Sequence, residues 1–297
     1  METLLLKGKP VSDSIRLSLE PRLQSLQESG IVPKLAAIIV GDDPASQVYV
    51  RNKARAFRKL NCESQTYQLD SKSSEEDVLT LIDRLNNDPS VHGILLQLPL
   101  PHHLDSKTIL HTVSPNKDVD GFHPENLGLL LEGNPNFIPC TPHGVLEILR
   151  HYDIPVSGRH AVIVGRSNIV GKPMFALLAQ KFEMGNATVT ICHTGTKDLA
   201  TYTKQGDIII AAAGSANMIT GDMIKEGADI IDVGINRVDD DSEKGYILVG
   251  DVNTKSVMGI ANSVTPVPGG VGPMTITMLL VNTVTSAEKC IELVAGW

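Results

Sequence analysis

The stretch that decides the fold runs from Ala161 to Pro173 and reads Ala-Val-Ile-Val-Gly-Arg-Ser-Asn-Ile-Val-Gly-Lys-Pro. Its four leading apolar residues predict a strand buried on both faces, and Pro173 suits the first turn of a helix. A strand, a glycine turn and a helix in this order present helix N–H groups to an anion. The match to G-x-G-x-x-G is imperfect, because Ser167 replaces the second glycine and Gly171 comes one position late. The stretch therefore predicts a dinucleotide-binding turn, with a glycine turn of another α/β unit as the alternative.

The next predicted strand, Thr188 to Cys192, favours NADP over NAD. An NAD-specific site usually places Asp or Glu after this strand to hold the ribose 2′-hydroxyl. The chain continues instead with His193-Thr194-Gly195-Thr196, which has no carboxylate. Arg166 stands in the first loop, where a guanidinium can pair with a 2′-phosphate through two hydrogen bonds.

Around this stretch, helical and strand patterns alternate along nearly the whole chain, which is typical of an α/β protein with largely parallel sheets. Residues 111–144 read as loop, and a domain boundary is expected near Pro139 to Pro142. The remaining predicted segments, in chain order, are helix 12–26, strand 35–40, helix 46–60, strand 93–98, helix 173–181, strand 207–212, strand 229–233, a glycine and proline loop 267–273 and an apolar helix 274–294.

Length and composition exclude several classes of protein. The 297 residues suffice for about two domains, and a net charge of −8 argues against nucleic acid as the main partner. The four cysteines are widely spaced, which fits reduced thiols in a cytoplasm better than a disulfide or zinc scaffold. No metal site is expected. The three leucines at positions 4–6 are too short for a signal peptide, and no apolar run reaches the roughly 20 residues that span a membrane.

A first set of candidate catalytic residues lies on the predicted helix 46–60. Tyr49 and Lys53 are four residues apart and therefore share one face of the helix. The lysine pKa falls readily on desolvation, so such a side chain can act as an acid or a base near neutral pH. An adjacent Tyr can stack on an aromatic substrate. From the helix alone, an ordinary basic face is the stronger interpretation, because four further Arg and Lys residues occur between positions 51 and 59.

Two further candidates follow the predicted strand 93–98. Gln97 is the one polar residue in Gly-Ile-Leu-Leu-Gln-Leu-Pro and sits at the carboxyl end of that strand, where open α/β sheets bind ligands. A structural role in capping the backbone is an equal alternative. Asp118 and Asp120 flank Val119 before Gly121, and a carboxylate there suits paired N–H donors such as a pterin edge. Taken alone, the D-x-D-G motif favours a turn stabilised by Asp side chains.

Taken together, these segments make the chain resemble the bifunctional methylenetetrahydrofolate dehydrogenase/cyclohydrolase family over essentially its whole length. The motifs that carry the resemblance are Val40–Ser46 with Tyr49 and Lys53, Gly93–Pro101, Pro115–Phe122, Gly165–Pro173 and Pro266–Thr275. Each motif alone is moderately specific, whereas all of them in family order are highly specific.

The resemblance implies two α/β domains with an active-site cleft between them. A folate-binding, parallel-sheet catalytic domain is expected over residues 1–140, completed by a returning carboxyl-terminal helix over 274–297, with a Rossmann-type NADP-binding domain over 141–273. The implied enzyme oxidises 5,10-methylenetetrahydrofolate with NADP and hydrolyses the methenyl product to 10-formyltetrahydrofolate. It is expected to be a cytoplasmic homodimer, joined through its cofactor domains, that supplies purine biosynthesis.

The resemblance also implies residue roles. Lys53 is expected to be the catalytic acid or base, Gln97 to position it, and Tyr49 and Asp120 to hold the folate. The other implied folate contacts are Leu98, Pro99, Pro268 and Gly269, and the implied cofactor contacts are Gly165, Arg166, Ser167, Gly171, Thr194 and Ile235. We also expect a cis peptide bond at Leu98-Pro99, at Val267-Pro268 or at both.

One departure from the family pattern concerns the cofactor. The family commonly has Ser, a basic residue and Thr after the Cys-His pair, whereas this chain has Thr194-Gly195-Thr196. Thr194 keeps a hydroxyl, but the basic neighbour is missing, so the reaction is better determined than the cofactor preference. The rival interpretations are a dehydrogenase without cyclohydrolase activity, a non-catalytic folate-binding protein, and a shikimate-type dehydrogenase.

Overall fold

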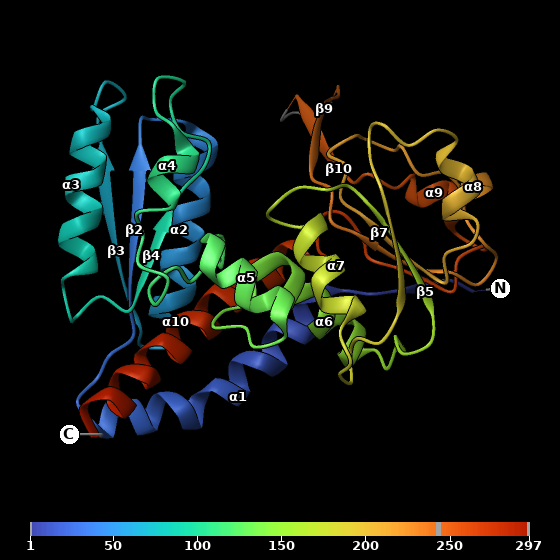
Figure 1. Cartoon of the computed structure of the whole chain (residues 1–297). Helices are drawn as coiled ribbons and strands as arrows, with labels where there is room; N and C mark the ends of the chain where they lie inside the picture. The colour runs from blue at the N-terminus through green and yellow to red at the C-terminus, as the bar shows by residue number, and fades with distance from the viewer. Residues whose placement is uncertain (1, 242–244, 296–297) are drawn as a thin grey trace. The chain divides into compact units, whose positions relative to one another are not determined.

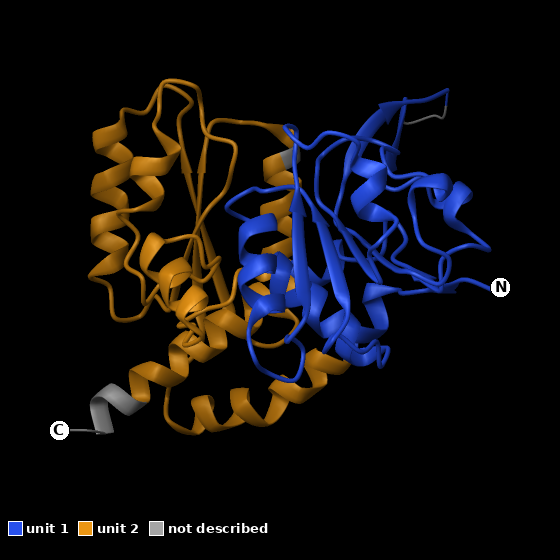
Figure 2. Cartoon of the chain, turned by 45° about the vertical axis from the view of Figure 1, so that its right-hand side comes forward, with its two compact units in different colours: residues 1–13, 141–275 blue, residues 14–140, 276–297 orange. Residues whose placement is uncertain are grey.

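The computed structural model describes residues 2–241 and 245–295, which form two compact units (Figure 2). Unit 1 contains residues 1–13 and 141–275, and unit 2 contains residues 14–140 and 276–297. Helices α1 (Gly8–Glu28) and α10 (Gly272–Ala295) each contribute residues to both units. The α/β class and the parallel sheets expected from the sequence are confirmed.

Unit 1 is built on a six-stranded parallel sheet, seen on the right in Figure 1. The sheet order is β1 (Leu4–Leu5), β11 (Ser263–Val264), β8 (Asp229–Asp232), β7 (Ile208–Ala211), β5 (His160–Val164) and β6 (Thr188–Cys192). The strand order reverses between β5 and β7, because β6 lies on one side of β5 and β7 on the other. Ligands bind parallel sheets at the carboxyl edge beside such a point.

Alternating side chains of these strands bury both faces of the sheet. Val162 and Val164 of β5 point into a core that also contains Ile219 and Val257, beneath η1 (Gly221–Met223) and α9 (Thr254–Val257). Helix α7 (Gly171–Ala179) packs on β5 and β6, and α8 (Leu199–Thr203) packs on β6. Four buried strands in the centre of the sheet give the carboxyl edge a rigid support.

Unit 2 holds a three-stranded parallel sheet in the order β3 (Glu63–Leu69), β2 (Lys34–Val40), β4 (Gly93–Leu96). Alternate residues of β2 pack beneath α3 (Glu75–Asn86) and α4 (Ser106–Leu110) in one apolar core. Helix α2 (Pro44–Arg58) contacts β2 and β3 and lies on the opposite side of the sheet from α3 in Figure 1. Every residue of β4 is buried, as the apolar sequence predicts.

The carboxyl-terminal helix returns to unit 2, as expected. Buried Asn282 of α10 donates through Nδ2 to the carbonyl oxygens of Val119 (2.8 Å) and Ile138 (2.9 Å). Nearer the end of the helix, Glu288 forms an ion pair with Arg22 of α1. The amide has two donors, and both are satisfied by these carbonyl oxygens.

The prediction of loop over residues 111–144 was wrong in part. Helix α5 occupies Pro124–Glu132, and α6 begins at Cys140 and runs to His151. The signals for α5 were local: the His123 side chain accepts from the N–H of Glu125, Pro124 starts the helix, and Gly133 ends it with φ 100°. Only nine residues separate these signals, so the helix is too short to show a clear apolar period.

Other differences are smaller. Strand β4 ends at Leu96 rather than Leu98, and the antiparallel hairpin of β9 (Asn236–Asp239) and β10 (Tyr246–Val249) was not predicted. The peptide bonds Leu98-Pro99 and Val267-Pro268 are both cis, which confirms that prediction.

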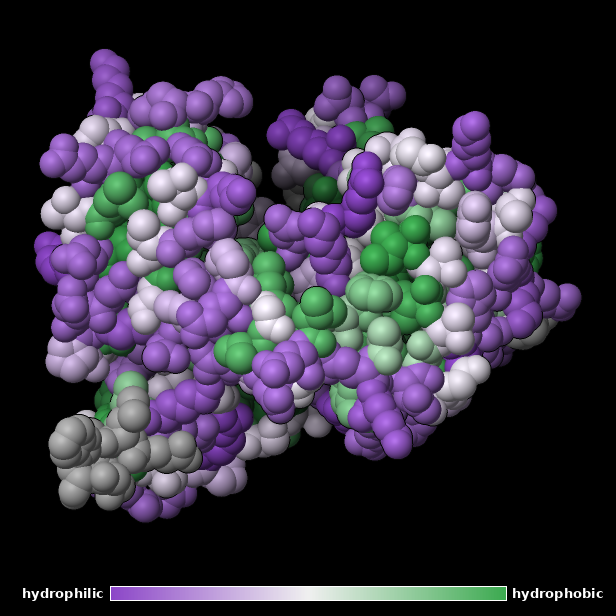
Figure 3. Space-filling view, viewed as in Figure 1, coloured by the Kyte–Doolittle hydropathy of each residue, from purple (hydrophilic) through white to green (hydrophobic). Residues whose placement is uncertain are grey.

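The surface is mostly polar on the face shown in Figure 3, with an apolar area over the part of unit 1 that contains α7. Exposed apolar side chains on α7 and beside it are Ile169, Phe175 and Phe182. Across the described residues, no helix combines the length and the hydropathy that a membrane span requires.

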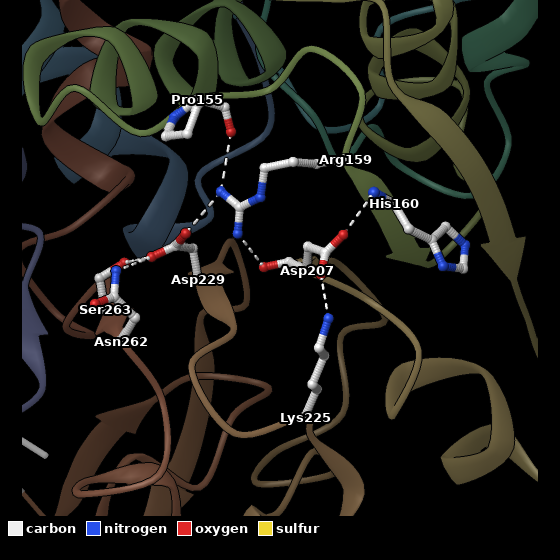
Figure 4. Close-up of polar contacts among 8 residues, drawn as sticks. All are labelled: Pro155, Arg159, His160, Asp207, Lys225, Asp229, Asn262 and Ser263. Atoms are coloured by element: carbon white, nitrogen blue, oxygen red, sulfur yellow. Dashed lines mark hydrogen bonds and ion pairs between the residues drawn. The ribbon is translucent and has the colours of Figure 1, made fainter.

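Ion pairs close the amino edge of the unit 1 sheet (Figure 4). Arg159 pairs with Asp229 at 2.8 Å and donates to the carbonyl oxygen of Asp207 at 2.7 Å. Asp207 in turn accepts from the N–H of His160 and pairs with Lys225. Because these carboxylates face cations, the amino edge is a stabilising network rather than an open site.

Candidate active site

The first group of predicted residues is carried by α2. Asp43 caps this helix by accepting from the N–H of Ser46 at 2.7 Å, and Val50 and Phe57 anchor its buried face. Lys53, on the neighbouring face, is half-buried. Tyr49 lies one turn earlier and is 46 % exposed, so its ring is available to a ligand.

Gln97 follows β4 and meets Lys53. Its Nε2 donates to the carbonyl oxygen of Leu98 at 2.8 Å, which directs Oε1 toward the lysine. Lys53 Nζ donates to that Oε1 at 3.2 Å. One end of the Gln97 amide therefore binds backbone, and the other end contacts Lys53 Nζ.

Asp120 lies at the same edge of the sheet. A parallel bridge pairs Ile94 of β4 with Asp118, which brings the 118–120 segment alongside the strand. Buried Asp118 accepts from the N–H of His123 (2.7 Å) and from Asn126 Nδ2 (2.9 Å), so it stabilises the turn. Of the two carboxylates in the D-x-D-G motif, Asp118 therefore stabilises the turn, and Asp120 remains as the candidate ligand-binding group.

The electrostatics of Asp120 connect it to Lys53. Burial raises the pKa of the Asp120 carboxyl, and the positive charge of Lys53 partly counteracts that rise, while the charge of Asp118 adds to it. Burial also raises the pKa of the neighbouring Cys140 thiol well above its usual value, and this thiol donates to the carbonyl oxygen of Val119 at 3.4 Å. A lysine, an amide and a carboxyl with high proton affinity therefore form one cluster that is suited to moving protons.

The remaining predicted folate contacts fall in both units. Leu98 is half-buried and Pro99 is exposed, directly after Gln97 in unit 2. Pro268 and Gly269 are exposed in a loop of unit 1, where Gly269 accepts from the N–H of Gly8 at 2.9 Å.

A pocket of 540 Å³ opens at the carboxyl edge of β5, β6 and β7 in unit 1. Four of the predicted cofactor residues line it, namely Gly165, Arg166, Ser167 and Thr194. The other lining residues are Val164, His193, Thr196, Leu199, Ala212, Ala213 and Met218. Gly171 and Ile235 do not line this pocket, and Ile235 is 48 % exposed.

Glycine is required at two positions of the turn. Gly165 has φ 130°, and a Cβ there would lie 2.1 Å from the carbonyl oxygen of Ala212. A Cβ on Gly171 would lie 2.1 Å from the carbonyl oxygen of Gly165. Gly171 thus allows α7 to start against the turn, which explains why it serves the pocket without lining it.

The lining fits NADP. It contains no carboxylate that would repel a phosphate, and Arg166 is exposed without a hydrogen bond or ion pair to any described residue. The Ser167 hydroxyl accepts from the N–H of Val170 at 3.1 Å, which holds the loop against the start of α7. A cationic, carboxylate-free wall beside a helix N-terminus can bind an anionic dinucleotide.

The sequence did not single out the wall formed by Ala212 and Ala213. These residues follow β7, and the small Ala-Ala-Gly-Ser run at a carboxyl edge was a usable signal. His193 and Thr196 were noted only for lacking a carboxylate. They shape the loop, because His193 Nδ1 accepts from the N–H of Gly195 and Thr196 Oγ1 accepts from the N–H of His193.

No group of three or more His, Cys, Asp or Glu side chains within residues 2–241 and 245–295 is arranged to hold a metal ion.

Comparisons with known proteins agree with this geometry. Family models match the tetrahydrofolate dehydrogenase/cyclohydrolase catalytic domain over residues 6–120 and its NAD(P)-binding domain over residues 139–291. The chain is 53 % identical over 290 residues to the bifunctional protein FolD of Chlorobium chlorochromatii, which covers 96 % of this chain and 98 % of that protein.

Two solved structures are similar throughout. The bifunctional enzyme FolD of Campylobacter jejuni is 49 % identical with a TM-score of 0.91, covering 97 % of this chain and 99 % of its own. The methylenetetrahydrofolate dehydrogenase-cyclohydrolase of Trypanosoma brucei, solved with NADP and an inhibitor, is 37 % identical with a TM-score of 0.92, covering 98 % and 99 %.

Proposed function

The chain belongs to the tetrahydrofolate dehydrogenase/cyclohydrolase family, and on that premise we propose that Lys53 moves the protons of its reactions. The protein is a bifunctional enzyme that oxidises 5,10-methylenetetrahydrofolate with NADP and hydrolyses the methenyl product to 10-formyltetrahydrofolate. The observation that carries the proposal is the contact of Lys53 Nζ with Gln97 Oε1 beside Asp120.

In the hydrolysis, water adds to the methenyl carbon and the bond from that carbon to one ring nitrogen breaks. Lys53 Nζ accepts one proton from the attacking water and passes it to the departing nitrogen. The second proton of the water is released to solvent as the hydroxyl on that carbon becomes the formyl carbonyl. Gln97 Oε1 orients the amine through its 3.2 Å contact. A positioned acid or base of this kind contributes about 10²–10⁴ in rate.

The folate is held by the groups around this lysine. The Asp120 carboxyl faces the N–H donors of the pterin edge, and Tyr49 covers the ring and excludes water. Support comes from the exposure of Tyr49 and from the interaction of Asp120 with Lys53. Additional folate contacts are assigned to Leu98, Pro99, Pro268 and Gly269, all of which are exposed or half-buried.

The pocket of unit 1 holds the cofactor, and Lys53, Gln97, Tyr49 and Asp120 of unit 2 supply the main folate contacts. When bound, NADP accepts the hydride of the oxidation. Gly165 and Ser167 admit its diphosphate, Arg166 and Thr194 bind the 2′-phosphate, and Gly171 keeps the turn closed. Ile235, exposed after β8, is assigned to the cofactor as well.

The decisive experiment measures both activities in one preparation. Reduction of NADP by 5,10-methylenetetrahydrofolate and hydrolysis of 5,10-methenyltetrahydrofolate are each followed spectrophotometrically. Activity in both assays is expected, and Gln97→Ala should lower the rate of hydrolysis by displacing Lys53. Hydrolysis at the parent rate in that variant would show that Gln97 does not position the lysine.

The enzyme is further proposed to be a homodimer joined through unit 1. The exposed side chains of Ile169, Phe175 and Phe182 on α7 and beside it favour an interface there. Phe175→Glu should shift the mass measured by light scattering from a dimer to a monomer. A parent that is already monomeric would refute this arrangement.

The acidic composition and the four free cysteines fit a reducing cytoplasm, where we place the enzyme as a source of 10-formyl groups for purine biosynthesis. Cell fractionation tests the location, and purine dependence of a strain lacking the protein tests the role.

A further inference from the structure

A buried carboxylate behind the cofactor pocket has no part in the chemistry described above. Asp251 is 0 % exposed, and four neutral N–H groups donate to its carboxylate. The donors and distances are the backbone N–H of Ala213 (2.6 Å), Gly214 (2.8 Å) and Ser215 (2.9 Å) and the side-chain Nδ2 of Asn236 (2.8 Å). Three consecutive N–H groups bound to one carboxylate fix the conformation of a loop.

A second carboxylate, Asp232 at the end of β8, holds Asp251 in place. Its Oδ1 accepts from the N–H of Asp251 at 2.9 Å and its Oδ2 accepts from the N–H of Val252 at 2.9 Å. Glycine is required on both sides, because a Cβ on Gly234 would lie 2.2 Å from Asp251 Oδ1 and one on Gly250 would lie 1.8 Å from Asp232 Oδ2. The arrangement is therefore built into the backbone, not formed by chance at a surface.

The loop that Asp251 holds is a wall of the pocket. Ala212 and Ala213 line the pocket, and the carbonyl oxygen of Ala212 lies against Gly165, the turn glycine on the facing strand. A shift of this loop would change both the wall and the space that is available at Gly165. Packed neighbours transmit such shifts because protein interiors leave little free volume.

The amino edge of the same sheet shows that buried carboxylates here need not serve the pocket. Asp229 is 3 % exposed, pairs with Arg159 and accepts from Asn262 and Ser263, far along the strands from the pocket lining. Asp229 therefore provides a control that is also buried and also accepts several hydrogen bonds, but from side chains and without contact to the 213–215 loop.

We propose that Asp251 is a positioning residue for the dehydrogenase reaction, which sets the shape of the cofactor pocket by holding the N–H groups of residues 213–215. The inference rests on the proposed function only in assigning NADP to this pocket.

The test compares Asp251→Asn with Asp229→Asn in three measurements. Hydrogen exchange in the protein without NADP should be about 100-fold faster at residues 213–215 in Asp251→Asn, with the amides of β5 and β8 unaffected; loss of a charge-assisted hydrogen bond predicts an effect of this size. The dissociation constant for NADP should rise at least tenfold. The factor by which kcat/KM for NADP falls should be at least ten times the factor by which the rate of methenyl hydrolysis falls, because hydrolysis uses no NADP. Asp229→Asn should show none of these three changes beyond twofold.

A second variant tests the same inference if Asp251→Asn folds poorly. Ser215→Pro removes one of the three N–H donors and leaves the carboxylate intact, so it should accelerate exchange at Ala213 and Gly214 and weaken NADP several-fold. Unchanged exchange in both variants, or equal losses in NADP binding for Asp251→Asn and Asp229→Asn, overturns the inference. A parent protein that binds no NADP would instead refute the proposed function, and the exchange result would still report on the loop.

Discussion

Asp120 in unit 2 and Asp232 in unit 1 share one property and differ in their partners. Burial raises the pKa of both carboxyls, that of Asp232 to about 6. Beside Asp120 stands Lys53, whose positive charge opposes the rise. Beside Asp232, the described residues place the peptide N–H groups of Gly234, Asp251 and Val252 and the carboxylate of Asp251.

The difference accounts for the two roles that we propose, proton transfer beside Asp120 and control of backbone geometry beside Asp232. A lysine can give up or take a proton, so an amine beside a carboxyl is suited to proton transfer with a substrate. A peptide N–H donates a hydrogen bond but does not titrate, so the carboxylates of unit 1 fix backbone geometry instead. Substitutions in unit 2 should therefore change turnover, and substitutions in unit 1 should change binding or stability.

Lys53→Met gives the sharpest test of this division. We expect hydrolysis of methenyltetrahydrofolate to fall by about 10²–10⁴, because the positioned acid or base is lost. Affinity for NADP should stay within twofold, since the pocket of unit 1 is intact. Lys59→Met, at the exposed end of the same helix, is the control. Hydrolysis at the parent rate in Lys53→Met would show that this lysine is not the acid or base of the reaction.

The pH dependence of the free energy of unfolding tests whether burial raises the pKa of Asp232 in unit 1. The pKa of Asp232 is raised from 3.8 to about 6 in the folded protein, so folding favours the protonated form. Its contribution is complete below about pH 4 and is lost as the pH rises through 6, a change of about 3 kcal/mol in the free energy of unfolding. Asp207 at the amino edge has a lowered pKa because the His160 N–H and Lys225 bind its charged form, so its contribution is lost as the pH falls below 4.

Urea unfolding of the parent and of Asp232→Asn between pH 4 and pH 7 measures this change. The stability of the parent relative to the variant should decrease across the range. A difference that stays constant or increases with pH would show that the N–H groups, rather than burial, determine the proton affinity of Asp232.

Arg166→Ala should have a smaller effect, confined to binding. A charge-assisted pair with phosphate contributes about 1.5–3 kcal/mol, so NADP should bind about ten- to a hundredfold more weakly and NAD far less so. The measurement is kcat/KM for each cofactor in the parent and the variant. Equal losses for the two cofactors would mean that Arg166 serves the shared diphosphate or the fold.

The smallest effect is expected for Thr194→Val, which removes one neutral hydrogen bond to the 2′-phosphate. Such a bond contributes about 0.5–1.5 kcal/mol, so kcat/KM for NADP should fall severalfold while that for NAD is retained. If Thr194→Val lowers kcat/KM for NADP as much as Arg166→Ala does, the loop after β6 contributes as much to NADP binding as the guanidinium of Arg166.

Local patterns in the sequence were sufficient for much of the fold and part of the site. An unbroken apolar run predicted β5, a four-residue spacing placed Tyr49 and Lys53 on one face of α2, and a glycine turn predicted the pocket that Gly165 to Ser167 now line. These features depend on the chemistry of neighbouring residues, which the order of the chain states directly. Helix α5 was not predicted because its nine residues are too few to show a helical repeat of apolar positions.

The tertiary structure alone decided which distant residues meet. Lys53 and Gln97 are 44 positions apart, and they touch because parallel pairing of β2 and β4 brings the end of β4 beneath α2. Asp251 meets the N–H groups of residues 213–215 because it is bound to Asp232 at the end of β8, and β8 lies beside β7, which precedes those residues. Strand register and glycine contacts determine these meetings, and neither is encoded in the spacing of residues along the chain. The sequence was therefore sufficient to identify the reaction. The tertiary structure was needed to show that buried carboxylates such as Asp120 and Asp232 have different partners.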